Sequence, residues 1–567
     1  MKQKLLLFSA FLFILINLIF LSCGTEKSGY YPSKQPLIGD NKNQQPVSEK
    51  EKSDEDEDRA DFMISKKTKY KKMHEANDFK LEDRQIPFEL KDREKYQYYG
   101  ENPRVSPIVN PVSTFSVDVD TGSYTNTRRY IQKMGKLPPK DSIRVEEFIN
   151  YFEYKYPLPD GEIPFSINHE LAKSPFDPDR LLLHIGLQGI KIPFEQRPNS
   201  NLVFLIDVSG SMSSPNKLDL LKSALIMLTN QMTKRDNVSI VVYAGAAGVV
   251  LYPTSGSNKK KIKNALRKLN AGGSTAGGEG IILAYKMAEK AFIKGGINRV
   301  ILASDGDFNV GITNHSELIK LIEEKRKSGI ALTVLGFGMY NLNDKTMEQL
   351  ANKGNGNYFY IDNLNEARKV LVTELGSTLQ IIAKDVKIQI EFNPKYVSSY
   401  RLIGYENRKL KRKDFDNDKI DAGEIGAGHT VTAIYELTMT DSAKAKSDLR
   451  YSKEQKEIEG NIKKTDTKFS DEIAFFRLRY KKPNADNSIL YETPLRRSVI
   501  STDNTSDNFR FSAAVAHFAQ KLRKSEYNTD ISYDKILRVM RSSRGEDNWG
   551  YRKECENLVE LAKSLSD

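Results

Sequence analysis

The stretch that decides the fold is NLVFLIDVSGSMSS, residues 201–214. Its first six residues are almost all apolar and lack the alternation of a strand with one face in water, a pattern typical of a strand covered on both faces. The run then ends abruptly in the carboxylate of Asp207 and the hydroxyls of Ser209 and Ser211. The stretch therefore predicts a buried strand whose end carries a cluster of oxygen atoms.

The residues after this strand repeat the same order of strand and helix as far as about Ser377. Apolar runs such as NVSIVVYA, RVILASD and ALTVLGFG alternate with segments whose apolar residues recur at every third and fourth position. This alternation predicts a doubly wound α/β domain with a mostly parallel sheet, in which ligands bind beyond the carboxyl ends of the strands. We expect one domain over residues 199–378, with its functional site where the first strand ends.

Three sequence features are expected to meet at that edge of the sheet. They are Asp207, Ser209 and Ser211 in a DxSxS pattern, Thr275 in the glycine-rich NAGGSTAGGEG, and Asp305 at the end of the strand ILASD. Two carboxylates and three hydroxyls, with no His or Cys nearby, form a hard donor set that suits Mg²⁺ or Mn²⁺ better than zinc. Without a cation, the two carboxylates would repel each other at a half-buried edge. The sequence therefore predicts a divalent metal site.

With these residues in this order, the segment resembles the von Willebrand factor type A (VWA) domain with its metal-ion-dependent adhesion site. All five motif positions of the family are present, namely Asp207, Ser209, Ser211, Thr275 and Asp305. In the family these residues hold the metal directly or through water, and an open coordination position accepts a carboxylate from a partner. The resemblance implies a Mg²⁺ (or Mn²⁺) cofactor and a protein ligand that offers a carboxylate. A metal-free domain used as a scaffold is the alternative.

The N-terminus resembles a bacterial lipoprotein signal. Lys2 and Lys4 precede the apolar stretch LLLFSAFLFILINLIFLSC, and the small residue Ser22 stands directly before Cys23. In that class the chain is cut before the cysteine, so we expect residues 1–22 to be a signal peptide and Cys23 to carry lipid. An uncleaved transmembrane anchor is the second interpretation. Under either interpretation we expect the protein in the cell envelope, outside the cytoplasm, either periplasmic or surface-exposed.

Composition limits the other classes of function. The formal charge of +12 is spread over 87 basic and 75 acidic residues, without the domain-sized basic block of a nucleic-acid-binding protein. Residues 23–103 are polar and charged without a sustained apolar period, which predicts a lipidated N-terminus followed by a disordered tether. The second cysteine, Cys555, has no partner once Cys23 is lipidated, so we expect it to be a packed side chain rather than part of a disulfide.

Both flanks of the VWA-like segment contain alternating, strand-like runs. FSINHELA and RLLLHIGLQGIKI lie in an α+β region over residues 104–198, and the second run predicts a half-exposed antiparallel strand. KDVKIQIEF, HTVTAIYELTM and EIAFFRLRYKKP indicate an antiparallel β domain over residues 379–500. We expect the two flanks to pair into one β-sandwich into which the central domain is inserted, and residues 501–567 to be helical. The flanking runs STFSVDVDTGSYTNTRRYI and RGEDNWGYR also resemble those of bacterial envelope lipoproteins.

The acidic run DFDNDKIDAGE, residues 414–424, was compared with a calcium-binding loop. Asp414, Asp416 and Asp418 fit the first half of an EF-hand loop, but Lys419 replaces the turn glycine and Ile425 stands where the closing glutamate belongs. We therefore favour an acidic turn.

Enzymatic motifs are missing from the sequence. It has no GxxxxGK[ST] nucleotide loop, no GxSxG around Ser209 and no HExxH spacing, so we expect no catalysis. Two functions remain. One is a lipid-anchored envelope protein that binds a protein partner through the metal, and the other is a structural or assembly factor of the envelope in which the metal only stabilises the domain. A metal-dependent envelope hydrolase is a third, for which the sequence offers neither base nor nucleophile.

Overall fold

The computed structural model describes most of the chain after the predicted tether. The described residues are 94–117, 120–272, 277–306, 315–374, 379–440 and 469–566. They belong to one compact unit that begins at Glu89. The predicted signal peptide, Cys23 and residues 24–93 of the predicted tether lie outside these ranges. Residues 94–103, also expected to be disordered, are instead held on the folded body: Glu94 pairs with Arg129 at 2.6 Å, and Asn102 donates to the carbonyl of Leu402 at 2.9 Å. Within the described ranges, no helix has both the length and the apolar character needed to span a membrane.

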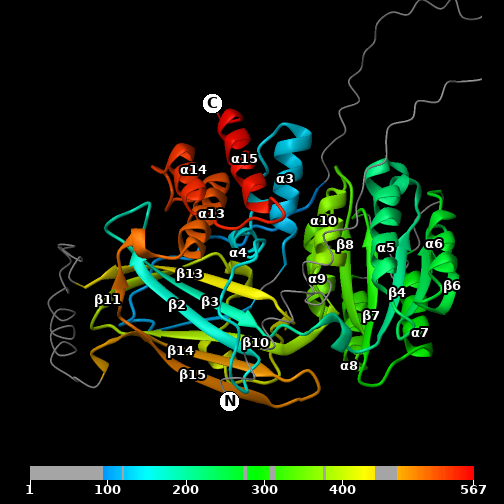
Figure 1. Cartoon of the computed structure of the whole chain (residues 1–567), viewed down its shortest axis with the longest axis horizontal. Helices are drawn as coiled ribbons and strands as arrows, with labels where there is room; N and C mark the ends of the chain where they lie inside the picture. Colours follow the sequence, from blue (N-terminus) through cyan, green and yellow to red (C-terminus); the bar gives the residue numbers. More distant parts are fainter. Residues whose placement is uncertain are drawn as a thin grey trace, which may run out of the picture. The chain divides into compact units, whose positions relative to one another are not determined.

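The central domain is built on a six-stranded sheet in the order β6-β5-β4-β7-β8-β9 (Figure 1). Its strands are β4 (Ser200–Asp207), β5 (Asn237–Tyr243), β6 (Ala247–Ser255), β7 (Ile297–Ser304), β8 (Ala331–Gly336) and β9 (Tyr358–Tyr360). Neighbouring strands are parallel except for β5 and β6, which are antiparallel. The predicted doubly wound, mostly parallel sheet is therefore confirmed.

Helices cover both faces of this sheet. On one face lie α5 (Leu220–Gln231), α6 (Lys259–Arg267) and α10 (Leu364–Arg368), and on the other α7 (Gly277–Lys290), α8 (His315–Lys327) and α9 (Asp344–Lys353). Successive side chains of β4 point to opposite faces, so Phe204 packs in the first core and Leu205 in the second. This double coverage explains why the sequence of β4 is apolar almost throughout.

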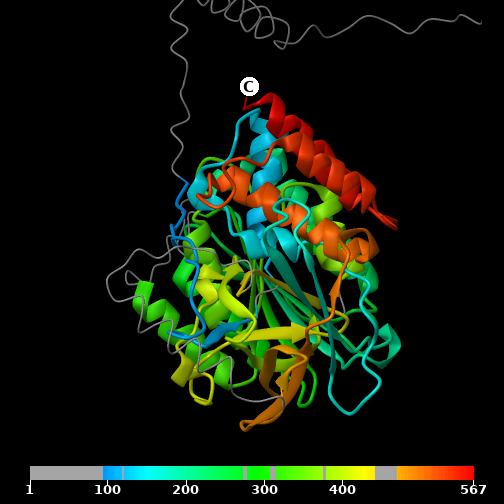
Figure 2. The same ribbon diagram turned by 90° about the vertical axis from the view of Figure 1, so that its left-hand side faces the viewer.

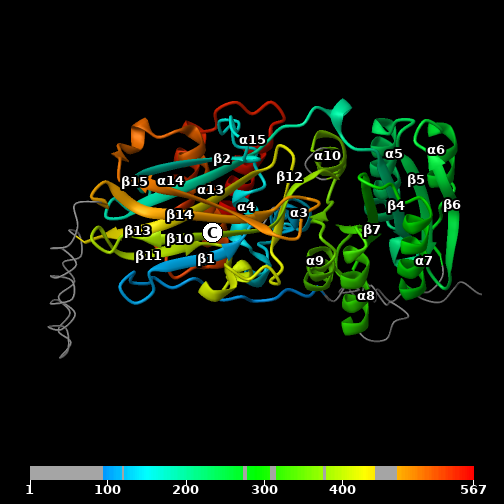
Figure 3. The same cartoon turned by 90° about the horizontal axis from the view of Figure 1, so that it is seen from below.

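The two flanks combine into a β-sandwich of two five-stranded sheets (Figure 3). The strands are β1 (Val112–Ser116), β2 (Phe165–Lys173), β3 (Leu181–Gly189), β10 (Ile381–Phe392), β11 (Val397–Ile403), β12 (Gly423–Gly426), β13 (Thr430–Met439), β14 (Glu472–Lys481), β15 (Ser488–Arg496) and β16 (Val499–Ile500). β1 pairs with β10, and β3 pairs with β13 so that Ile185 lies opposite Ala433. The shared sheets expected of the two flanks are thus present.

A layer of helices covers the outer face of the sheet that contains β3 and β13 (Figure 2). Its members are α3 (Gly122–Met134), α4 (Val145–Ile149), α13 (Asp507–Arg523), α14 (Tyr533–Ser542) and α15 (Tyr551–Ser564). Leu182 of β3 packs under these helices, whereas its neighbour Leu183 faces the core of the sandwich. Cys555 is buried in the helical layer, as expected of a packed side chain.

This helical layer overturns one sequence prediction. β3 was expected to be half-exposed, yet every one of its residues is buried. Its alternation came from polar side chains that lie inside the protein, such as His184, whose Nε2 lies 3.2 Å from the hydroxyl of Tyr156. An alternating pattern thus marked two different environments, the sandwich core and the helical layer, rather than a core and solvent.

The acidic run at residues 414–424 forms a turn whose carboxylates have separate partners. Asp416 accepts hydrogen bonds from Arg479, with an Nη2–Oδ1 distance of 2.8 Å. Asp421 pairs with Arg326 of α8 at 2.6 Å. Asp416 and Asp421 thus turn to different arginines, which fits the acidic turn favoured from the sequence.

Candidate metal centre

The loop after β4 brings three of the predicted donors together. β4 is central in the sheet, and its carboxyl end lies beside those of its parallel neighbours β5 and β7. Oδ1 of Asp207 accepts a hydrogen bond from the backbone N–H of Ser209 at 2.9 Å, and the hydroxyl oxygens of Ser209 and Ser211 are 3.0 Å apart. Asp207 is completely buried and Ser211 is exposed, so the cluster runs from the interior to the surface.

Asp305 follows β7 directly and contributes a second buried carboxylate to the same edge. Lys217 donates to its Oδ2 at 2.7 Å, whereas its Oδ1, although completely buried, has no hydrogen-bond partner among the described residues. A buried carboxylate oxygen that lacks a partner is costly, because it has lost its hydration without compensation. This oxygen is therefore suited to a ligand that supplies positive charge.

The electrostatics of Asp207 also favour a ligand that supplies positive charge. The pKa of Asp207 is raised to about 6, mainly by burial and in part by the nearby Asp305, while hydrogen bonds from Ser209 and Ser304 oppose the rise. Ser304 also donates its hydroxyl to Oδ2 of Asp207 at 3.2 Å. A cation between the two carboxylates would remove both their repulsion and the cost of burying negative charge.

Thr275 lies outside the described residues, so its place in the site stays a prediction. The chain on either side of its loop is described. The N–H of Gly272 donates to the carbonyl of Val208 at 2.8 Å, and a Cβ on Gly280 of α7 would lie 2.8 Å from Cβ of Tyr243. The loop therefore begins beside the backbone of the DxSxS segment, where the sequence placed Thr275.

Two residues at this edge were not singled out from the sequence. Ser304, which orients Asp207, precedes Asp305 in ILASD and could have been noticed as a hydroxyl at the end of a buried strand. Lys217 gave no such signal, because a single lysine six residues after Ser211 is ordinary in a loop that leads into a helix. Its ammonium group nevertheless contacts one of the predicted metal ligands.

The described donors fit a hard divalent cation. Asp207, Ser209, Ser211 and Asp305 offer carboxylate and hydroxyl oxygens, which are the ligand types that Mg²⁺ and Mn²⁺ prefer. The unpartnered Oδ1 of Asp305 and the raised pKa of Asp207 both indicate missing positive charge. Asp207 and Asp305 would hold the ion, and the exposed Ser211 marks the side from which a ligand could reach it.

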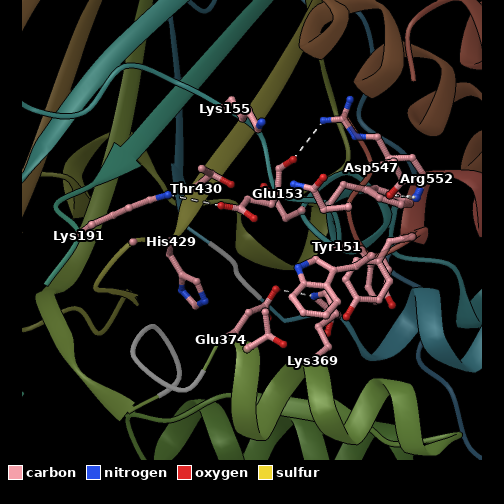
Figure 4. A pocket seen from close by; sticks show the side chains of 18 of the residues that line it. Tyr151, Glu153, Lys155, Lys191, Lys369, Glu374, His429, Thr430, Asp547 and Arg552 are labelled. Carbon is pink, nitrogen blue, oxygen red and sulfur yellow. Dashed lines mark hydrogen bonds and ion pairs between the residues drawn. The ribbon is translucent and has the colours of Figure 1, made fainter. Parts of the chain in front are cut away.

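A large cavity lies elsewhere in the described part of the protein (Figure 4). It has a volume of about 790 Å³ and is lined by the sandwich, the helical layer and the end of the central domain. Four of its labelled charges form two pairs, Lys191 with Glu153 at 3.5 Å and Lys369 with Glu374 at 2.9 Å. None of the described metal-site residues lines this cavity, so it is separate from the metal edge.

Comparisons with known proteins agree with this architecture. The family model "von Willebrand factor type A domain" matches residues 201–373, "Uncharacterized protein YfbK, C-terminal" matches residues 377–565, and "von Willebrand factor" matches residues 90–184. The Uncharacterized protein YfbK of Escherichia coli (strain K12) is 44% identical over 480 residues, which cover 83% of this chain and 82% of that protein.

A more distant relative matches only part of the chain, and a solved structure matches it with a low TM-score. The magnesium-chelatase 67 kDa subunit of Chlorobaculum tepidum is 31% identical over 199 residues, which cover 32% of each protein. A solved structure of a von Willebrand factor type A protein from Catenulispora acidiphila has 15% identity and a TM-score of 0.39, and covers 71% of this chain and 96% of that one.

The central sheet, its helices and the matching family model define the chain as a VWA-domain protein. The likeness to the Escherichia coli protein reaches well beyond that domain into both flanks. The chain belongs to the YfbK family.

Proposed function

We propose that this chain is a lipid-anchored protein of the cell envelope that binds a protein partner through a divalent metal held by Asp207, Ser209, Ser211, Thr275 and Asp305. The observation that carries the proposal is the unpartnered Oδ1 of Asp305, buried beside the carboxylate of Asp207. Such an atom is costly unless a bound group compensates it. A bound Mg²⁺ would supply that compensation.

The protein's own residues would prepare the site for the ion. The N–H of Ser209 and the hydroxyl of Ser304 hold the two oxygens of Asp207, which fixes the orientation of its carboxylate. Lys217 fixes Asp305 in the same way through Oδ2. When bound, the metal would act as a Lewis acid that accepts a carboxylate oxygen from the partner. Because these ligands are held before the metal arrives, little reorganisation is needed on binding.

The envelope location is supported by the N-terminal sequence. Lys2 and Lys4, the apolar stretch and the Ser22–Cys23 pair together have the order of a lipoprotein signal. Lipid on Cys23 would anchor the chain to a membrane, and residues 24–93 would separate the folded part from the lipid surface. Mass spectrometry of the mature N-terminus tests this part, since a diacylglycerol-modified Cys23 is expected and an intact Met1 would contradict it.

Partner binding is tested by affinity capture from an envelope extract. The full-length chain in detergent is used as bait in Mg²⁺, in EDTA, and as the Asp207→Ala variant in Mg²⁺. We expect a protein to be retained by the wild type with metal and to be lost in both other conditions. Retention of the same proteins in all three conditions would show that the metal site is not the contact surface.

The second candidate function is a structural or assembly factor in which the metal only stabilises the domain. The three-layered arrangement of sandwich and helices, which offers large surfaces away from the metal edge, favours it. The Asp207→Ala variant distinguishes the two candidate functions. If the metal bridges a partner, Asp207→Ala abolishes capture, and its melting temperature falls by no more than the stabilisation that Mg²⁺ binding gives the wild type. If the metal is structural, the same variant lowers the melting temperature and spares capture. We propose no catalytic turnover.

A further inference from the structure

The predicted metal site lies beside a positively charged side chain of the protein. Lys217 lies in η4 (Pro215–Asp219), a single π-helical turn between the DxSxS loop and α5. Its side chain is only 10% exposed, and its Nζ lies 2.7 Å from Oδ2 of Asp305 and 3.4 Å from Oδ1 of Asn341. An ammonium group at this depth has given up most of its hydration, so its position is set by the surrounding protein.

The fold provides a narrow channel for the stem of this lysine. Gly338, in the loop after β8, has a φ of +84°, and a Cβ at that position would lie 2.2 Å from Cε of Lys217. Any other residue would collide with the lysine stem and would also strain the backbone. Gly306, with a φ of +110°, lets the backbone of Asn341 and Leu342 approach the residue that follows Asp305 in a similar way. Two segments distant in sequence, the end of β7 and the loop after β8, thus enclose Lys217.

Lys217 occupies only one side of Asp305. Oδ2 receives the ammonium group, whereas Oδ1 has no partner. Asp207, by comparison, has hydrogen bonds from the protein on both of its oxygens, none of them from a cation. The lysine therefore compensates Asp305 through Oδ2 and leaves Oδ1 available to a ligand.

The charges explain what this arrangement does. Two carboxylates and one ammonium group leave the metal-free site with one net negative charge, and a divalent cation changes this to one net positive charge. A site without the lysine would carry two negative charges before the metal binds and none afterwards. At a few ångströms and in a partly buried setting, one unit of charge changes binding by at least tenfold.

We propose that Lys217 is a built-in counter-ion that determines the specificity of the metal site. It weakens the binding of the divalent cation on its own and leaves the loaded site positive, so that an anionic ligand such as a carboxylate binds with the metal. Metal and carboxylate therefore bind cooperatively, and Lys217 strengthens that coupling. This inference rests on the proposed metal site and its carboxylate ligand, and it identifies the residue that couples their binding.

The first test measures Mg²⁺ affinity by titration calorimetry, on the full-length chain in detergent at mildly alkaline pH. Lys217→Met is expected to bind Mg²⁺ at least about tenfold more tightly than the wild type, and Lys217→Arg to stay within about threefold of it. Lys222→Met is the matched control. That lysine lies five residues along, pairs with the exposed Asp219 at 3.2 Å, and its loss removes the same charge away from the carboxylates of the site.

The outcomes separate this inference from the proposed function. Equal or weaker Mg²⁺ binding by Lys217→Met, with circular dichroism like that of the wild type, overturns the inference while the metal site stands. If neither the wild type nor Lys217→Met binds Mg²⁺, the metal site itself is rejected. Lys217→Gln serves as a second neutral variant in case the methionine variant does not fold, and it is expected to change the affinity in the same direction.

The second test uses acetate as a carboxylate probe and acetamide as its uncharged counterpart, at constant ionic strength. The apparent affinity of the wild type for Mn²⁺, followed by electron paramagnetic resonance of the free ion, is expected to rise at least about threefold in acetate and to stay constant in acetamide. In Lys217→Met the acetate effect is expected to fall to less than half of that. An acetate effect of equal size in both proteins overturns the role of Lys217 in anion selection.

Discussion

Arg128 and Asp305 are both enclosed almost completely by protein, but their charges are compensated to different extents. Every donor nitrogen of Arg128 is used: Nε and Nη2 bond Asp362 at 2.8 and 2.6 Å, Nη2 also bonds Glu366 at 2.8 Å, and Nη1 bonds Glu554 at 2.8 Å. Asp305 has one oxygen on Lys217 and the other without a partner.

This difference separates a structural charge from a candidate functional one. Arg128 joins α3 to α10 of the central domain and to α15 of the helical layer, and nothing further is needed to satisfy it. The metal edge is compensated only in part, and the remaining deficit is of the sign that a cation supplies. At a buried edge where two carboxylates meet, such a deficit favours a bound cation.

The largest effect is expected from Arg128→Met, which removes the fully paired structural charge. The variant leaves the buried Asp362 and Glu366 without their cation, which costs about 3–5 kcal/mol in the free energy of unfolding. Urea denaturation followed by circular dichroism measures the loss. Lys325→Met, whose partner Glu289 is largely exposed, is the control and is expected to stay within about 0.5 kcal/mol of the wild type. A loss for Arg128→Met as small as that of the control would show that the buried cluster is not structural.

The next effect concerns pH and the metal edge in EDTA. The pKa of Asp207 is about 6 in the folded protein and near 3.8 in the unfolded chain. The folded state therefore holds this proton more tightly. Protonation of Asp207 stabilises the folded state by up to about 3 kcal/mol below about pH 4, and this stabilisation is lost as the pH rises through 6.

The Asp207→Asn variant isolates that contribution from the other titrating groups. Free energies of unfolding are measured for both proteins between about pH 4 and 7 in EDTA. We expect the wild type to lose stability relative to the variant as the pH rises. A difference that stays constant over this range would contradict the raised pKa.

Metal removal gives the third effect. If Mg²⁺ binds only the folded protein, a concentration about one hundred times its dissociation constant stabilises the fold by about 2.7 kcal/mol. Asp305→Asn is expected to lose this gain, since it removes the charge of the buried carboxylate that lacks a partner on one oxygen. Thermal denaturation with Mg²⁺ and with EDTA measures both proteins. Equal stabilisation of wild type and variant by Mg²⁺ would show that the ion binds elsewhere.

The sequence predicted the parts of this molecule that depend on local pattern. The solid apolar run of β4 required cover on both faces, and parallel strands required Asp207 and Asp305 to meet at one edge. The burial of β3 could not be predicted, because its outer face is covered by helices that are distant in the sequence. Lys217 was missed for a similar reason. The direction of a long, flexible side chain depends on the space that Gly338 leaves for it, and no local pattern records that space.

The smallest effect is expected at the acidic run, residues 414–424, whose exposed carboxylates can be compared with the buried Asp305. Asp416 is 72% exposed and pairs with Arg479 at 2.8 Å, so it is hydrated on one side and paired on the other. Asp416→Asn is therefore expected to change the free energy of unfolding by less than about 0.5 kcal/mol. Ca²⁺ is expected to leave the difference in melting temperature between Asp416→Asn and the wild type unchanged. A Ca²⁺-dependent stabilisation lost only in Asp416→Asn would show that the run binds an ion. Negative charges close together in the sequence would then matter as much for ion binding as a buried carboxylate oxygen without a partner.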